Sequence, residues 1–175
     1  MVSILFVNIF KLLAVAIGTG ATTVLVAQSL AAAKDNKISK DEQNLLGIVM
    51  LIIRMSILML FLAQAWLTAV VYTGLNINLA ILTSVNTLTW MLLGVLFITF
   101  VFIDYGIIDR QLGISVQLST WFTLVFAWAW PILMPLSLDA FLLSYILFTF
   151  LAVFFIKKSH QLVGSAQFLH RKTKA

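Results

Sequence analysis

The sequence predicts an all-α integral membrane protein, a bundle of five transmembrane helices with its N-terminus outside and its C-terminus in the cytoplasm. Two compositional observations predict the class, because 62% of the 175 residues are hydrophobic and only 10% are charged. Soluble domains average about 45–50% apolar residues and about 25% charged residues. The third observation is where the cations lie, and it predicts the orientation.

Five apolar blocks are each long enough for one crossing, since a helix needs about 20 mostly apolar residues to span the hydrocarbon layer. Barrel strands would alternate apolar and polar residues, whereas residues 92–98 read LLGVLFI. The blocks are therefore predicted to be helices, because lipid offers the backbone N–H and C=O groups no partner outside the helix. A transmembrane domain is therefore predicted over residues 1–156, followed by a basic cytoplasmic tail over 157–175. The predicted helices are 4–33, 40–73, 77–103, 112–136 and 138–156.

The first block carries small residues four apart, at Ala14, Gly18 and Thr22. Such a stripe lets two membrane helices approach closely, so we expect it to pack against another helix, either of this chain or of a second copy. The adjoining run GTGATT is not a nucleotide loop, because a phosphate cradle needs a preceding strand and access to solvent.

A signal peptide is the competing interpretation of the first block. Lys11, the apolar run and the alanines at 31–33 imitate a cleavage site. Cleavage there would leave four crossings and place the cations of the tail outside, against the usual distribution of Lys and Arg.

The second helix is predicted to begin near Lys40, because Ser39 and Glu42 have the spacing of a capping box. A short turn over 74–78 joins it to the third helix as an antiparallel hairpin.

Arg54 is the most costly residue of the second helix. It lies nine residues beyond Leu45, about 13 Å into the membrane at 1.5 Å per residue. A cation at that depth costs several kcal/mol unless it is paired, so it is a candidate functional residue. Alternatively, its side chain extends back towards the cytoplasm to meet Asp104 or Asp109.

Two amides are expected to meet inside the same hairpin. Gln64 and Asn86 each lie eleven residues from Leu75 in the turn, so an antiparallel pair brings them to one depth, where they can satisfy each other. Together with Thr87 and Arg54, they form the candidate intramembrane polar site. Both a structural hydrogen bond and a small polar pocket are consistent with this pattern.

The fourth block contains Pro131 and Pro135, which predict a bend near its outer end. The fifth block precedes a tail whose apolar residues recur at helical spacing. That spacing, together with five Lys and Arg between 157 and 174, predicts a short amphipathic helix on a surface of anionic lipid.

The orientation follows from the distribution of the cations. Nine of the eleven Lys and Arg residues lie within 34–40, at Arg110, or within 157–174. Five crossings place these three regions on one side, whereas the turns 74–78 and 136–139 on the other side contain none. The positive-inside rule assigns the cation-rich side to the cytoplasm.

Residues for catalysis or cofactor binding are not apparent within the apolar blocks. Both histidines, His160 and His170, are in the tail, and the carboxylates near the blocks lie at their ends. We therefore expect no enzyme, no metal and no cofactor. Cys is absent, which excludes disulfides and thiolate chemistry.

The expected function is that of a helix-bundle component in the cell membrane, typical of a bacterial inner membrane, that assembles with itself or with a partner membrane protein. One alternative is a small transporter or channel with a polar path through the bundle. Another is a protein that binds lipid or an apolar cofactor between its helices.

Overall fold

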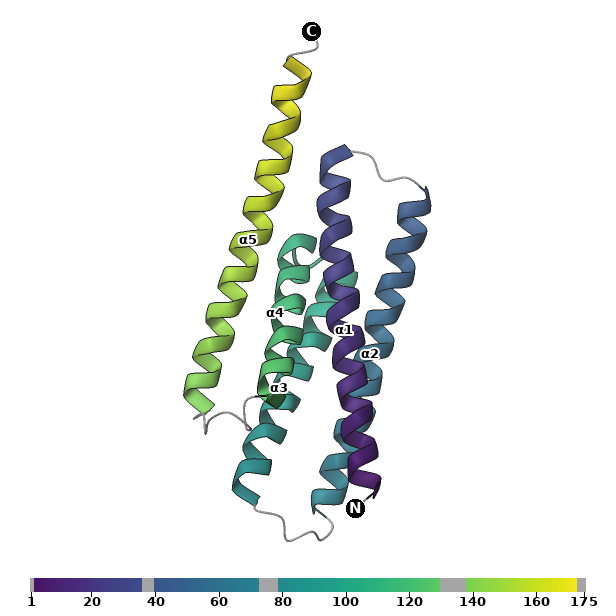
Figure 1. Ribbon diagram of the computed structural model, residues 1–175, viewed down its shortest axis with the longest axis vertical. Coiled ribbons are helices and arrows are strands. Elements are labelled where there is room, and N and C mark those ends of the chain that lie inside the picture. Colours follow the sequence, from purple (N-terminus) through teal and green to yellow (C-terminus); the bar gives the residue numbers. More distant parts are fainter. Residues whose placement is uncertain (1, 36–39, 73–78, 130–137, 173–175) are drawn as a thin grey trace.

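The computed structural model describes residues 2–35, 40–72, 79–129 and 138–172, and these residues form helices and no strand. The helices run alongside one another as one bundle (Figure 1), and the all-α prediction is confirmed. They are α1 (Val2–Asp35), α2 (Lys40–Tyr72), α3 (Leu79–Asp104), α4 (Arg110–Ala129) and α5 (Leu138–Lys172).

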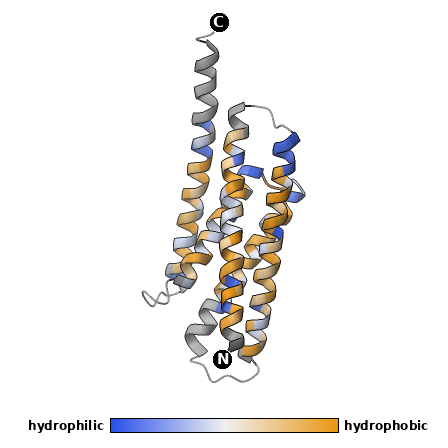
Figure 2. Cartoon of the chain, turned by 45° about the vertical axis from the view of Figure 1, so that its right-hand side comes forward, coloured by the Kyte–Doolittle hydropathy of each residue, from blue (hydrophilic) through white to orange (hydrophobic). Residues whose placement is uncertain are grey.

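Four helices of the described part are long and apolar enough to cross a membrane, which indicates a membrane-embedded protein. Their candidate spans are Leu5–Ala31, Lys40–Val70, Asn86–Asp104 and Phe141–Ser159. Figure 2 shows hydrophobic residues along most of the described length of these helices, with a hydrophilic end where α2 begins.

Helix α4 is not among these spans, although the sequence predicts a crossing over 112–136. It packs against α1, α3 and α5, and a helix covered by neighbours on several sides needs apolar residues only on the side that stays exposed, where α4 has Leu112, Phe122, Val125 and Phe126. Its buried polar residues are Ser115, Gln117, Ser119, Thr120 and Thr123. The bend predicted at Pro131 and Pro135 lies outside the described residues.

The turn between α3 and α4 has a well-defined cap. The N–H of Ile107 donates to the Phe102 carbonyl at 2.9 Å, and the N–H of Gly106 donates to the Ile103 carbonyl at 3.1 Å. This is the Schellman pattern, and it needs a left-handed residue that glycine supplies at φ 65°. Helix α3 therefore stops at Asp104.

Helix α5 is longer than predicted. It continues through Ile156, where the fifth block ends, as far as Lys172, and it extends past the other helices (Figure 1). No proline interrupts residues 138–172, so the basic segment prolongs the helix. Helix α2 begins at Lys40, as predicted. Ser39 of the proposed capping box lies outside the described residues.

The core is formed by apolar side chains from all the described helices. Its largest fully buried members include Leu25, Ile53, Leu60, Leu96 and Trp121. Many large apolar side chains are instead exposed, particularly on α5, as expected of helices whose outer faces meet lipid.

Candidate functional site

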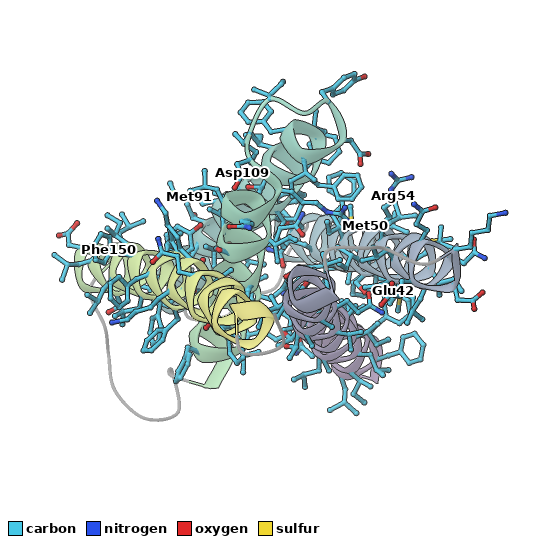
Figure 3. The ribbon with its side chains drawn as sticks, turned by 90° about the horizontal axis from the view of Figure 1, so that it is seen from above. Glu42, Met50, Arg54, Met91, Asp109 and Phe150 are labelled. Atoms are coloured by element: carbon cyan, nitrogen blue, oxygen red, sulfur yellow. The ribbon has the colours of Figure 1, made fainter. Side chains whose placement is uncertain are left out.

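Arg54 reaches the end of α3. Its Nη2 donates to Oδ2 of Asp104 at 2.8 Å, and its guanidinium lies 4.8 Å from the centre of the Phe100 ring. Seen along the bundle, Arg54 projects from the side of α2 opposite to α1 (Figure 3). Asp104 is the last residue of α3, so the contact with Asp104 expected under the alternative interpretation of Arg54 is present.

The predicted amide pair is also present. Nε2 of Gln64 donates to Oδ1 of Asn86, and Gln64 is completely buried. The Thr68 hydroxyl donates to the Gln64 carbonyl at 2.8 Å, and Nε1 of Trp90 donates to that hydroxyl oxygen at 3.1 Å. These bonds join α2 to α3 and fix the indole of Trp90 between them.

The four residues of the candidate intramembrane polar site do not line one cavity. Arg54 and Gln64 are ten residues apart on α2, about 15 Å along a helix. Thr87 is exposed, whereas its neighbour Asn86 is partly buried in the amide network. A continuous polar path through Arg54, Gln64, Asn86 and Thr87 is therefore not what this arrangement provides.

An apolar groove lies between the two polar groups instead. It has a volume of about 600 Å³ and opens between α2 and α3, within the range of about 300–1,000 Å³ for ligand sites. Trp90 lies at one end, edge-on to Phe61 with ring centres 5.5 Å apart. Arg54 lies at the other end. The remaining lining residues are Ile57, Leu58, Leu93, Gly94, Phe97 and Phe100.

Gly94 leaves the groove wide. A Cβ added there would meet no atom within 4 Å, so this glycine faces open space and a longer side chain at position 94 would occupy the groove. No sequence pattern indicates this feature, because it depends on the separation of two helices.

A polar depression adjoins the Arg54 end of the groove. It has a volume of about 540 Å³ and is formed largely by the α3–α4 turn, with Asp104, Asp109 and Arg110 in its lining and Met50 on the α2 side. The Arg54–Asp104 ion pair lies at the junction, because Arg54 lines the groove and Asp104 lines the depression.

The small-residue stripe packs inside the chain. Ala14, Gly18 and Thr22 are all buried, and the Thr22 hydroxyl donates to the Gly18 carbonyl at 2.8 Å. A Cβ at Gly18 would lie 2.5 Å from Cη2 of Trp121. The partner of the stripe at Gly18 is therefore α4.

Polar groups from both helices are also buried where α1 packs against α4. Lys11 is only 4% exposed, and its Nζ lies 4.5 Å from the centre of the Trp128 ring. Within the described part of the chain, both amide atoms of Gln117 and the Nε1 atoms of Trp121 and Trp128 are buried without a hydrogen-bond partner. Tertiary packing buries them, and no periodicity in the sequence indicates that.

Among the described residues, no group of three His, Asp or Glu side chains is placed to hold a metal ion. Comparison with protein-family models, with curated proteins and with solved structures finds no match. The geometry of the groove is thus the basis for a functional assignment.

Proposed function

We propose that this protein is a non-catalytic, multi-pass membrane protein that binds a membrane lipid in the groove between α2 and α3. The observation that carries the proposal is the groove itself, which has a volume of about 600 Å³, is lined by apolar and aromatic side chains, and ends at a half-exposed Arg54. An amphiphile requires this combination of an apolar groove and a polar end.

The length of the groove supports a lipid tail as its occupant. Trp90 and Phe100 mark its two ends on α3 and are ten residues apart, about 15 Å along a helix. One leaflet is half of a hydrocarbon layer of about 30 Å. The groove is therefore about as long as a single leaflet is deep.

The topology we propose has five crossings, with the N-terminus outside and the C-terminus in the cytoplasm. It is supported by the clustering of nine cations in regions 34–40, 110 and 157–174. The proposed location is the plasma membrane, as in a bacterial inner membrane. The Arg54 end of the groove then faces the cytoplasmic leaflet, where the basic tail is proposed to contact anionic lipid.

Lipid binding is better supported than assembly through the small-residue stripe, because Gly18 packs against Trp121 of the same chain. Lipid binding is also better supported than transport, because the residues of the candidate intramembrane polar site do not line a common cavity. A binding protein of this kind could still act beside a partner membrane protein.

Blocking the groove tests the proposal. Leu at position 94 fills open space, so we expect Gly94→Leu to remain folded but to retain much less lipid than the wild type after purification in mild detergent, measured by native mass spectrometry. Gly20→Leu is the matched control, since a Cβ at Gly20 also meets nothing within 4 Å and lies outside the groove. Equal lipid retention by both variants, or none by the wild type, would contradict the proposal.

A further inference from the structure

We infer that the groove selects lipids with an anionic phosphate headgroup and that Arg54 is the residue that recognises the headgroup. The inference rests on the proposed lipid binding and adds the chemical class of the ligand. Two adjoining features support it, the unused donors of Arg54 and the polar depression beside the groove.

Arg54 has donors available for a second partner. A guanidinium carries five N–H donors, and within the described residues its hydrogen-bond partner is the Asp104 carboxylate, through Nη2. The Arg54 side chain is 52% exposed, so its other N–H groups are accessible. Phe100 lies against the guanidinium and restricts its orientation. A planar fork held in this way suits bidentate binding of phosphate oxygens.

The depression supplies space for the headgroup. It lies beside Asp104, on the α3–α4 turn, and its lining contains one further cation, Arg110, and one further carboxylate, Asp109. A lipid whose tail follows the groove from Trp90 to Phe100 would bring its phosphate to Arg54 and its headgroup to the depression. The apolar groove and the polar depression thus form two parts of one site for an amphiphile.

Asp104 gives the inference a distinctive consequence. Its carboxylate accepts a hydrogen bond from Nη2 of Arg54. It also repels an anion, so it competes with the headgroup for the donors of Arg54. Removing the charge of Asp104 should strengthen anionic binding, whereas removing the charge of Arg54 should weaken it. A purely structural ion pair would respond alike to both changes, since either one breaks it.

The test measures lipid selectivity on the full-length protein in detergent by native mass spectrometry. The probes are phosphatidylglycerol and diacylglycerol with identical acyl chains, since diacylglycerol lacks the phosphate. We expect the wild type to prefer the phospholipid about tenfold, the scale of one charge-assisted contact. Arg54→Gln should reduce that preference to about onefold and leave diacylglycerol retention unchanged, whereas Asp104→Asn should keep or increase it. Arg54→Lys, which keeps the charge but loses the fork, should give an intermediate preference.

The outcomes separate the two proposals. Equal retention of both lipids by the wild type, or an equal loss of preference in Arg54→Gln and Asp104→Asn, would overturn headgroup recognition and leave the proposed function in place. Retention of neither lipid would overturn the proposed function itself. Excess glycerol phosphate, which carries the headgroup chemistry without chains, should not displace bound phosphatidylglycerol. Complete displacement would show that the site binds free phosphate and would overturn the assignment to a lipid.

Discussion

A methyl group added at Gly18 should destabilise the bundle, whereas the same change two residues later should not. Gly18 lies beneath the indole of Trp121, and a Cβ there would be 2.5 Å from Cη2 and 2.6 Å from Cε2 of that ring. Trp121 is fully buried, so the ring has no free space into which it can move. At Gly20 an added Cβ meets nothing within 4 Å.

The magnitude follows from comparing the two variants. Gly→Ala within a helix gains roughly 0.5–1 kcal/mol from helix propensity, and this gain is shared by Gly18→Ala and Gly20→Ala. Overpacking of a filled core costs typically about 1–3 kcal/mol, and only Gly18→Ala incurs it. The difference between their free energies of unfolding should therefore be about 1–3 kcal/mol.

The assay is equilibrium unfolding in mixed detergent micelles titrated with sodium dodecyl sulfate, followed by circular dichroism. Trp121→Phe in the Gly18→Ala background should recover part of the loss, because the smaller ring makes room for the methyl group. Coupled neighbours of this kind typically show interaction energies of about 0.5–3 kcal/mol.

Equal stability of Gly18→Ala and Gly20→Ala would refute the packing of Gly18 against Trp121. The mass of the protein–detergent complex supplies an independent check, because an internal contact predicts no change in oligomeric state. If Gly18→Ala reduced that mass without altering the stability of the single chain, the stripe would instead join two copies.

Two further predictions concern polar groups buried between helices. A double-mutant cycle with Gln64→Ala and Asn86→Ala should give a coupling energy of about 0.6 kcal/mol, typical of hydrogen bonds between membrane helices, and additive losses in the same unfolding assay would contradict the pairing. Lys11→Met should raise the free energy of unfolding, because the several kcal/mol that a buried ammonium costs exceed the roughly 2 kcal/mol available from a ring such as Trp128. A lower stability of Lys11→Met would mean that Lys11 has a stronger partner than that ring.

Local pattern was sufficient to predict most of the helical architecture and one of its polar contacts. Helix α2 begins at the predicted Lys40, and α3 begins and ends within two residues of its predicted limits. Gln64 and Asn86 could be paired from sequence, because equal distances from a turn bring two residues to the same level of an antiparallel hairpin. That inference needed no knowledge of the rest of the bundle.

Burial and depth were harder to predict, because both depend on neighbouring helices. Lys11 lies near the start of the first apolar block, yet it is buried against Trp128 of α4. The depth of Arg54 was counted along α2 from Leu45, but its partner is the last residue of α3. Arg54 therefore lies fourteen residues from the start of α2 and beside the end of α3, a relation that a count along α2 alone does not give.

The composition of α4 bears on the proposed topology in the same way. Helices α3 and α5 both run towards the end of the bundle at which α2 begins (Figure 1). The chain must therefore run back through α4, whose twenty residues extend about 30 Å, the thickness of the hydrocarbon layer. Helix α4 packs against α1, α3 and α5, and its polar residues are buried there, whereas its exposed face carries Leu112, Phe122, Val125 and Phe126. Its polar character is thus compatible with a fifth crossing, and an odd number of crossings is what gathers the cation-rich segments on one side, together with the Arg54 end of the groove.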